Sequence, residues 1–178
     1  MIYVAPLMQV VVYVGFWWLT QTAKRHTLGE VKVSKTAFWF QTVAIFFFVI
    51  TMASLDTGTG IDAIHGICAV CFFTLMFVGL FKTTCLLKSI RAKSPSAITA
   101  KSLKFKETIN YLMIFTAIYG VGATLLKDFI HGKWHHFLFE LGNSAEWVGV
   151  TLICLYLGSF SWDWPGLEIR LSMPTYKV

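Results

Sequence analysis

The chain has 178 residues, of which 56% are hydrophobic and only 13% are charged, and its mean hydropathy is +0.66. A soluble domain carries roughly 25% charged residues, so this chain has too few charges to solvate the surface of so small a globule. Intrinsic disorder is excluded because it requires low hydrophobicity. A disulfide scaffold is excluded because the 4 cysteines all lie in apolar runs. The composition therefore predicts an all-α, polytopic membrane protein.

Five apolar stretches predict a single bundle of five transmembrane helices, because a helix needs roughly 17–25 residues to cross a hydrocarbon core of ~30 Å. Transmembrane strands would instead alternate apolar and polar residues, whereas the run at 45–50, IFFFVI, is apolar throughout. The predicted spans are residues 2–20, 38–55, 64–87, 109–126 and 145–162.

The basic residues predict the orientation of the bundle, since lysine and arginine gather on the cytoplasmic or matrix side during insertion. The connection at 56–62 has no lysine or arginine, whereas the connections before and after it in the chain are basic. We therefore expect the N-terminus outside and the C-terminus inside. The non-spanning parts are then an inner loop at 88–108, an outer loop at 127–144 with a short interfacial helix, and an inner tail at 163–178.

Of the 15 lysines and arginines, 13 belong to the predicted inner loops, to the inner tail or to Lys82 at the inner end of a span, so the net charge of +6 does not indicate nucleic-acid binding. A basic cluster beside the membrane can bind anionic lipid head groups, at roughly 1 kcal/mol per lysine or arginine. The alternative is that the cluster only fixes the topology. Its members are Lys88, Arg91, Lys93, Lys101, Lys104 and Lys106.

Polar residues gather at the outer ends of the predicted spans, among them Asp56, Asp62, His65 and Glu146. An ionisable group at the edge of hydrocarbon is costly and normally faces the bundle or a wet cavity. His65 and Glu146 are expected at one depth, where this polar cluster would recognise a lipid head group. The alternative is that acids at helix N-termini complement the helix dipole, which fits Asp62 and Glu146.

The cysteine and histidine patterns do not predict a metal, a cofactor or a catalytic group. Cys68 and Cys71 form one C-x-x-C, but a zinc site usually needs two such pairs, so apolar packing is favoured. A bis-histidine haem would need His65 to face the histidines near 131–136, which lie in a stretch that looks interfacial. The small faces of Ala145-x-x-x-Gly149 and Gly120-x-x-x-Thr124 favour close helix packing, within this chain or against a partner.

Two stretches resemble a known family. One is Ile50-Thr51-Met52-Ala53-Ser54-Leu55-Asp56, followed by His65 and Phe72-Phe73, and the other is Ser144-Ala145-Glu146-Trp147. Together they are similar to the damage-regulated autophagy modulators and the Golgi factor acting after GPI attachment. That family usually has six spans with both termini inside, so this five-span chain looks like a truncated member. The resemblance implies roles in GPI lipid remodelling, autophagy or phosphoinositide organisation, and points to His65 and Glu146.

We therefore expect a lipid-interacting, non-catalytic membrane protein of this family, with membrane lipids and proteins within the membrane as its partners. The alternative is a small accessory subunit of a large membrane assembly such as the respiratory chain. A metal- or haem-bearing oxidoreductase is a third, weaker hypothesis. The compartment stays open between the endomembrane system (Golgi, lysosome or plasma membrane) and the mitochondrial inner membrane.

Overall fold

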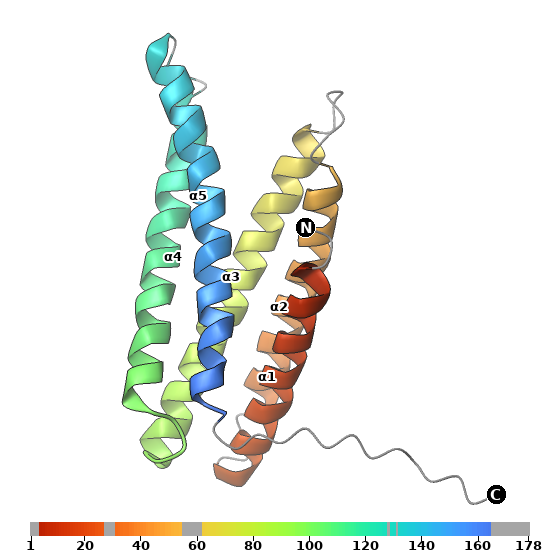
Figure 1. The fold of residues 1–178 in the computed structure, drawn as a ribbon, viewed down its shortest axis with the longest axis vertical. Helices are drawn as coiled ribbons and strands as arrows, with labels where there is room; N and C mark the ends of the chain where they lie inside the picture. Colours follow the sequence, from red (N-terminus) through yellow and green to blue (C-terminus); the bar gives the residue numbers. More distant parts are fainter. Residues whose placement is uncertain (1–3, 27–30, 55–61, 128, 131, 165–178) are drawn as a thin grey trace, which may run out of the picture.

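The computed structural model describes residues 4–26, 31–54, 62–127, 129–130 and 132–164. Within these ranges the chain is helical and contains no strand, which confirms the predicted all-α class. The elements in the described part are α1 (Val4–His26), α2 (Val31–Ala53), α3 (Asp62–Lys93), α4 (Ala100–Lys127), α5 (Lys133–Gly158) and the short 3-10 helix η1 (Ser159–Trp162) (Figure 1).

Four candidate membrane spans lie in the described residues. They are Ser34–Ala53, Ile64–Lys93, Ala100–Leu126 and Trp134–Trp162, and each is long and apolar enough to cross a bilayer. Helix α1 is not among these four, so it remains a predicted fifth span. A multi-pass integral membrane protein is the class that four such helices indicate.

The helices form two groups that α3 connects. Helix α2 packs against α1 and α3, whereas α4 packs against α5. Helix α3 lies beside α2 at its N-terminal end and runs diagonally to lie below α4 at its C-terminal end (Figure 1). The C-terminal ends of α1, α3 and α5 point the same way, so Lys24 and Arg25 lie at the same end of the bundle as the α3–α4 connection.

Close backbone approach holds α2 against α3. A Cβ added at Gly79 of α3 would lie 2.6 Å from Gln41 Cγ and 3.2 Å from the Ala37 carbonyl oxygen, both on α2. Gln41 is buried and donates a hydrogen bond of 3.0 Å from Nε2 to Thr83 Oγ1. Interhelical hydrogen bonds of this kind add to van der Waals packing between membrane helices, where lipid supplies no hydrophobic drive.

The predicted small faces on α4 and α5 pack within the chain. A Cβ at Gly120 would lie 2.7 Å from Ala145 Cβ, and a Cβ at Gly142 would lie 3.1 Å from Thr124 Oγ1. A Cβ at Gly149 would lie 2.8 Å from the ring of Phe73 on α3. Glycine at these positions therefore allows α4, α5 and α3 to come together.

The helices extend beyond the predicted spans, and the inner loop is correspondingly short. Helix α3 continues to Lys93, and α4 begins at Ala100, so only residues 94–99 connect them rather than 88–108. Lysine and arginine favour helix, so charge ends an apolar run without ending the helix. Pro95 disfavours helix at Ser94, and Thr99 caps α4 by accepting a hydrogen bond of 3.2 Å from the Ser102 amide.

The region predicted as an outer loop also differs, because α5 begins at Lys133 and is continuous to Gly158. Gly132 precedes it with φ of +82°, a left-handed conformation that glycine adopts readily. The residues from Trp134 onward that were expected in a separate interfacial helix are thus the first part of α5. Glu146 lies well inside α5, so the dipole interpretation of Glu146 does not hold, since that effect fades within the first turn.

Candidate functional site

A groove of about 350 Å³ lies between α3, α4 and α5. Several lining residues are glycine or alanine, whose small side chains leave space between the helices, and Phe73 and Phe77 of α3 add apolar surface. Threonine hydroxyls come from Thr74 and Thr116. The remaining lining residues are Gly66, Ala69, Val70, Ala117, Gly120, Val121, Thr124, Leu125, Gly142, Ala145, Glu146 and Gly149.

Glu146 is the one charged side chain among the described residues that line this groove. It is exposed at its position on α5, although α5 belongs to a candidate span. Carboxylates in such segments are rare, and they normally face a bundle interior or a wet cavity. The position of Glu146 on the groove wall matches that pattern.

His65 lies in the first turns of α3 and bridges to α2. Its Nδ1 lies 3.1 Å from the carbonyl oxygen of Thr51. Because a carbonyl only accepts hydrogen bonds, Nδ1 is the donor, and Nε2 of a neutral ring is then an acceptor. His65 also interacts electrostatically with Glu146, so two of the residues singled out from the sequence lie near each other.

The other two predicted members of the polar cluster cannot be placed in the same way. Asp56 lies outside the described residues. Asp62 is the first residue of α3, at the position expected for an acid that complements the helix dipole, and its side chain is outside the described part.

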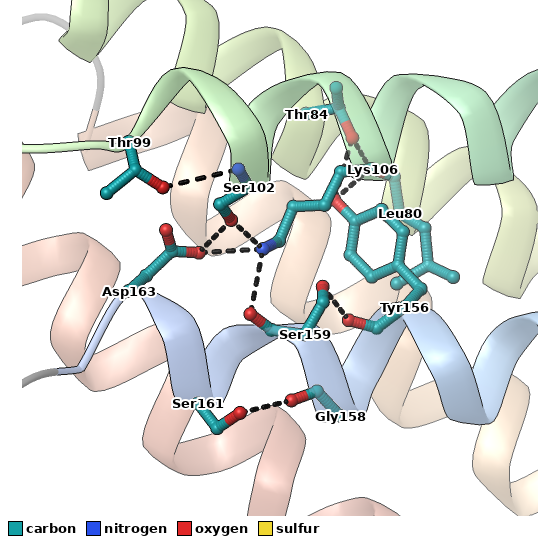
Figure 2. A network of polar contacts seen from close by, with 10 residues as sticks. All are labelled: Leu80, Thr84, Thr99, Ser102, Lys106, Tyr156, Gly158, Ser159, Ser161 and Asp163. Atoms are coloured by element: carbon teal, nitrogen blue, oxygen red, sulfur yellow. Dashed lines mark hydrogen bonds and ion pairs between the residues drawn. The ribbon is translucent and has the colours of Figure 1, made fainter.

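A second polar site lies at the opposite end of the same three helices, and it is buried. Lys106 of α4 extends its ammonium to Asp163, which follows η1, at 2.7 Å from Oδ2. The same nitrogen donates to Ser102 Oγ at 2.7 Å and to the Ser159 carbonyl at 3.3 Å (Figure 2). Both charged side chains are 0% exposed. Such additional hydrogen bonds help to offset the cost of burying the ammonium, whereas Asp163 Oδ1 is buried without a hydrogen-bond partner in the described part of the chain.

The buried network continues to α3 through Tyr156. The Tyr156 hydroxyl of α5 lies 2.7 Å from Thr84 Oγ1 and donates to the Leu80 carbonyl at 3.1 Å. Asn110 of α4 donates from Nδ2 to Thr84 Oγ1 at 2.8 Å. Thr84 is therefore the point at which α3, α4 and α5 share hydrogen bonds. We call Thr84, Ser102, Lys106, Asn110, Tyr156 and Asp163 the buried polar node.

Lys106 was predicted in the basic cluster of the inner loop, but it lies on α4 and is buried. It lies on the face of α4 that also buries Ser102, Ile109, Asn110 and Met113. These positions follow the three- and four-residue spacing of one helix face, and this spacing is the signal that could have located Lys106 in the sequence. The partner Asp163 carried no such signal, because it follows the last helix.

The other predicted basic residues do lie together at the end of the bundle. The side chains of Lys88, Lys93, Lys101 and Lys104 are exposed. Lys88 pairs with Glu107 at 2.7 Å, and Lys101 lies 5.8 Å from the centroid of the Trp162 ring. Arg91 donates to the Ile98 carbonyl at 2.6 Å, which holds the short α3–α4 connection against α3.

The cysteines and histidines are dispersed over the described part of the chain. All four cysteines are free thiols, with Cys68 buried in the packing of α3. His135 and His136 are exposed at the start of α5, and His136 Nδ1 lies 3.9 Å from Glu140. Among the described residues, no three histidine, cysteine or acidic side chains come together in an arrangement that could hold a metal ion.

Comparison with known proteins identifies the family. A model of the Frag1/DRAM/Sfk1/Cwh43P N-terminal domain matches residues 1–167, which is nearly the whole chain. No curated protein and no solved structure matches it. The family resemblance expected from the segments near His65 and Glu146 is confirmed, and with it an integral membrane protein. The chain belongs to the Frag1/DRAM/Sfk1/Cwh43P family.

Proposed function

We propose that this protein binds a membrane lipid in the groove between α3, α4 and α5, and that it binds the lipid without converting it. The observation that carries this proposal is Glu146, a carboxylate on the wall of a groove of about 350 Å³ within a candidate span. Small-molecule sites are typically concave and mostly apolar, with a few polar groups that fix orientation. The groove has this composition.

The cost of placing a carboxylate here supports a binding role. A charged side chain in the membrane is costly by about 2.5–3.5 kcal/mol at a helix centre, so its presence calls for a compensating interaction. The electrostatic interaction with His65 supplies part of that compensation. The polar part of a lipid entering the groove would supply the rest.

The cellular membrane in which the protein lies is proposed from its family, because the fold alone does not indicate a compartment. Membership in the Frag1/DRAM/Sfk1/Cwh43P family favours an endomembrane location. In this proposal α1 is the fifth span, the N-terminus lies outside and the basic end of the bundle lies inside, so Glu146 is reached from the outer or lumenal leaflet.

Lipid retention by the full chain tests the proposal. The protein would be extracted in a mild detergent, and the lipid that remains bound would be quantified by native mass spectrometry. Glu146→Gln and His65→Ala should each reduce retained lipid, whereas Glu140→Gln and His135→Ala, which change exposed residues of α5 outside the groove, should not. Equal retention in all four variants and the unmodified protein would contradict a lipid site at Glu146.

A further inference from the structure

We propose that the groove selects lipids whose head group carries a primary ammonium, and that Glu146 is the residue that binds this ammonium. The inference rests on the proposed function, because it specifies the lipid class for the same site. It is carried by Glu146, the one charged group among the described residues that line the groove.

Charge complementarity favours a cationic group. Of the described lining residues, Glu146 alone is charged, and the others are small, aliphatic, aromatic or threonine. A carboxylate attracts a cation, and the lining offers no other charge that would compete with it. It equally repels a phosphate or another carboxylate, so the group that lies next to Glu146 is not the phosphate of an anionic lipid.

Hydrogen bonding favours a cationic head group that carries N–H groups. An ionised carboxylate is an acceptor only. A primary ammonium has three donors for the oxygens of Glu146, and its hydrogen bonds to a carboxylate are among the strong ones. A trimethylammonium group has no N–H and cannot form them.

The shape of the groove leaves room for a head group and part of a chain. On α3 its lining runs from Gly66 to Phe77, a distance of about 16 Å at 1.5 Å per residue. A Cβ at Gly66 would meet no atom within 4 Å, so the groove is open there. Phe73 and Phe77 supply an apolar wall for methylene groups beyond the head group.

A competition between three lipids tests the inference. The full chain would be placed in nanodiscs with equal amounts of phosphatidylethanolamine, phosphatidylcholine and phosphatidylglycerol of identical acyl chains, and the lipids retained after mild extraction would be measured. We expect phosphatidylethanolamine to be enriched on the order of tenfold over the other two, as a hydrogen bond to a charged group predicts. Glu146→Gln should remove this enrichment, whereas Glu140→Gln should preserve it.

The outcomes separate this inference from the proposed function. If the unmodified protein retains the three lipids in the proportions of the bilayer, or retains phosphatidylcholine as well as phosphatidylethanolamine, the ammonium inference is wrong although a lipid site remains. If it retains no lipid, the proposed function fails as well. Because the comparison among the three lipids uses the unmodified protein, it decides the inference even if Glu146→Gln does not fold.

Discussion

Lys106 Nζ lies 2.7 Å from Asp163 Oδ2, and neither side chain is exposed. This pair connects α4 to the residue that directly follows η1, so the end of the last helix is held by a charge rather than by apolar packing alone. Ser102 and the Ser159 carbonyl share the ammonium, which satisfies it in a region with little water.

Breaking this pair on one side should destabilise the protein strongly. Lys106→Met or Asp163→Leu leaves the other charge buried without its partner, which costs about 3–5 kcal/mol. The double variant should lose less than either single one, because both charges are removed together. Thermal unfolding in detergent measures the effect. Lys88→Met is the matched control, since its pair with Glu107 is partly exposed and such pairs contribute about 0–1 kcal/mol. Equal losses in Lys88→Met and Lys106→Met would contradict the interpretation.

Gly79→Ala should loosen the contact between α2 and α3. The new methyl would lie 2.6 Å from Gln41 Cγ, and Gln41 is held by its bond to Thr83. Overpacking of this kind typically costs about 1–3 kcal/mol. Gly122→Ala on α4 meets nothing within 4 Å and should leave the midpoint of thermal unfolding unchanged or slightly raised. A similar midpoint for the two variants would show that α2 yields at this contact.

The basic end of the bundle should bind anionic membranes through its exposed lysines. Replacing Lys88, Lys101 and Lys104 by glutamine should weaken binding of the solubilised protein to phosphatidylserine vesicles by about 1 kcal/mol per residue at low salt. High salt should reduce binding of the unmodified protein, since exposed charges are screened. If binding is unchanged in the triple variant, these lysines do not bind lipid head groups and serve only to fix the orientation of the protein in the membrane.

Five spans require Lys24 and Lys101 to share one side of the membrane and Trp134 to lie on the other. Single cysteines at these positions, in a background without the native cysteines, should be labelled by an impermeant thiol reagent accordingly: Lys24→Cys and Lys101→Cys from one side, Trp134→Cys from the opposite side. Labelling of Lys24→Cys and Lys101→Cys from different sides would remove α1 as a span and, with it, the proposed orientation.

The helical class could be predicted from the sequence, because apolar length determines it, and small residues at fixed spacing predicted close helix packing without deciding between this chain and a partner. The ends of the helices could not be predicted, because hydropathy detects only the apolar part of a helix. The polar residues His135, His136 and Glu140 made the start of α5 look like a loop, although the helix begins at Lys133.

The candidate site was predictable in its residue types and not in its shape. His65 and Glu146 stood out as ionisable groups in apolar surroundings. The groove beside Glu146 depends on how α3 leaves α2 and crosses towards α4 (Figure 1), and no spacing within one helix encodes that crossing. The same holds for Asp163, whose partner Lys106 lies on a different helix.

The buried polar node and the groove occupy different lengths of the same three helices. The node ties α3 near Thr84 to α5 near Tyr156, whereas the groove lies beyond, between Gly66–Phe77 and Gly142–Gly149. Polar contacts thus join all three helices at the node, whereas beside the groove the close contacts are between small residues and one ring, namely Gly120 with Ala145 and Gly149 with Phe73. A substitution in the node is therefore expected to act on stability, and one in the groove on what the groove can hold.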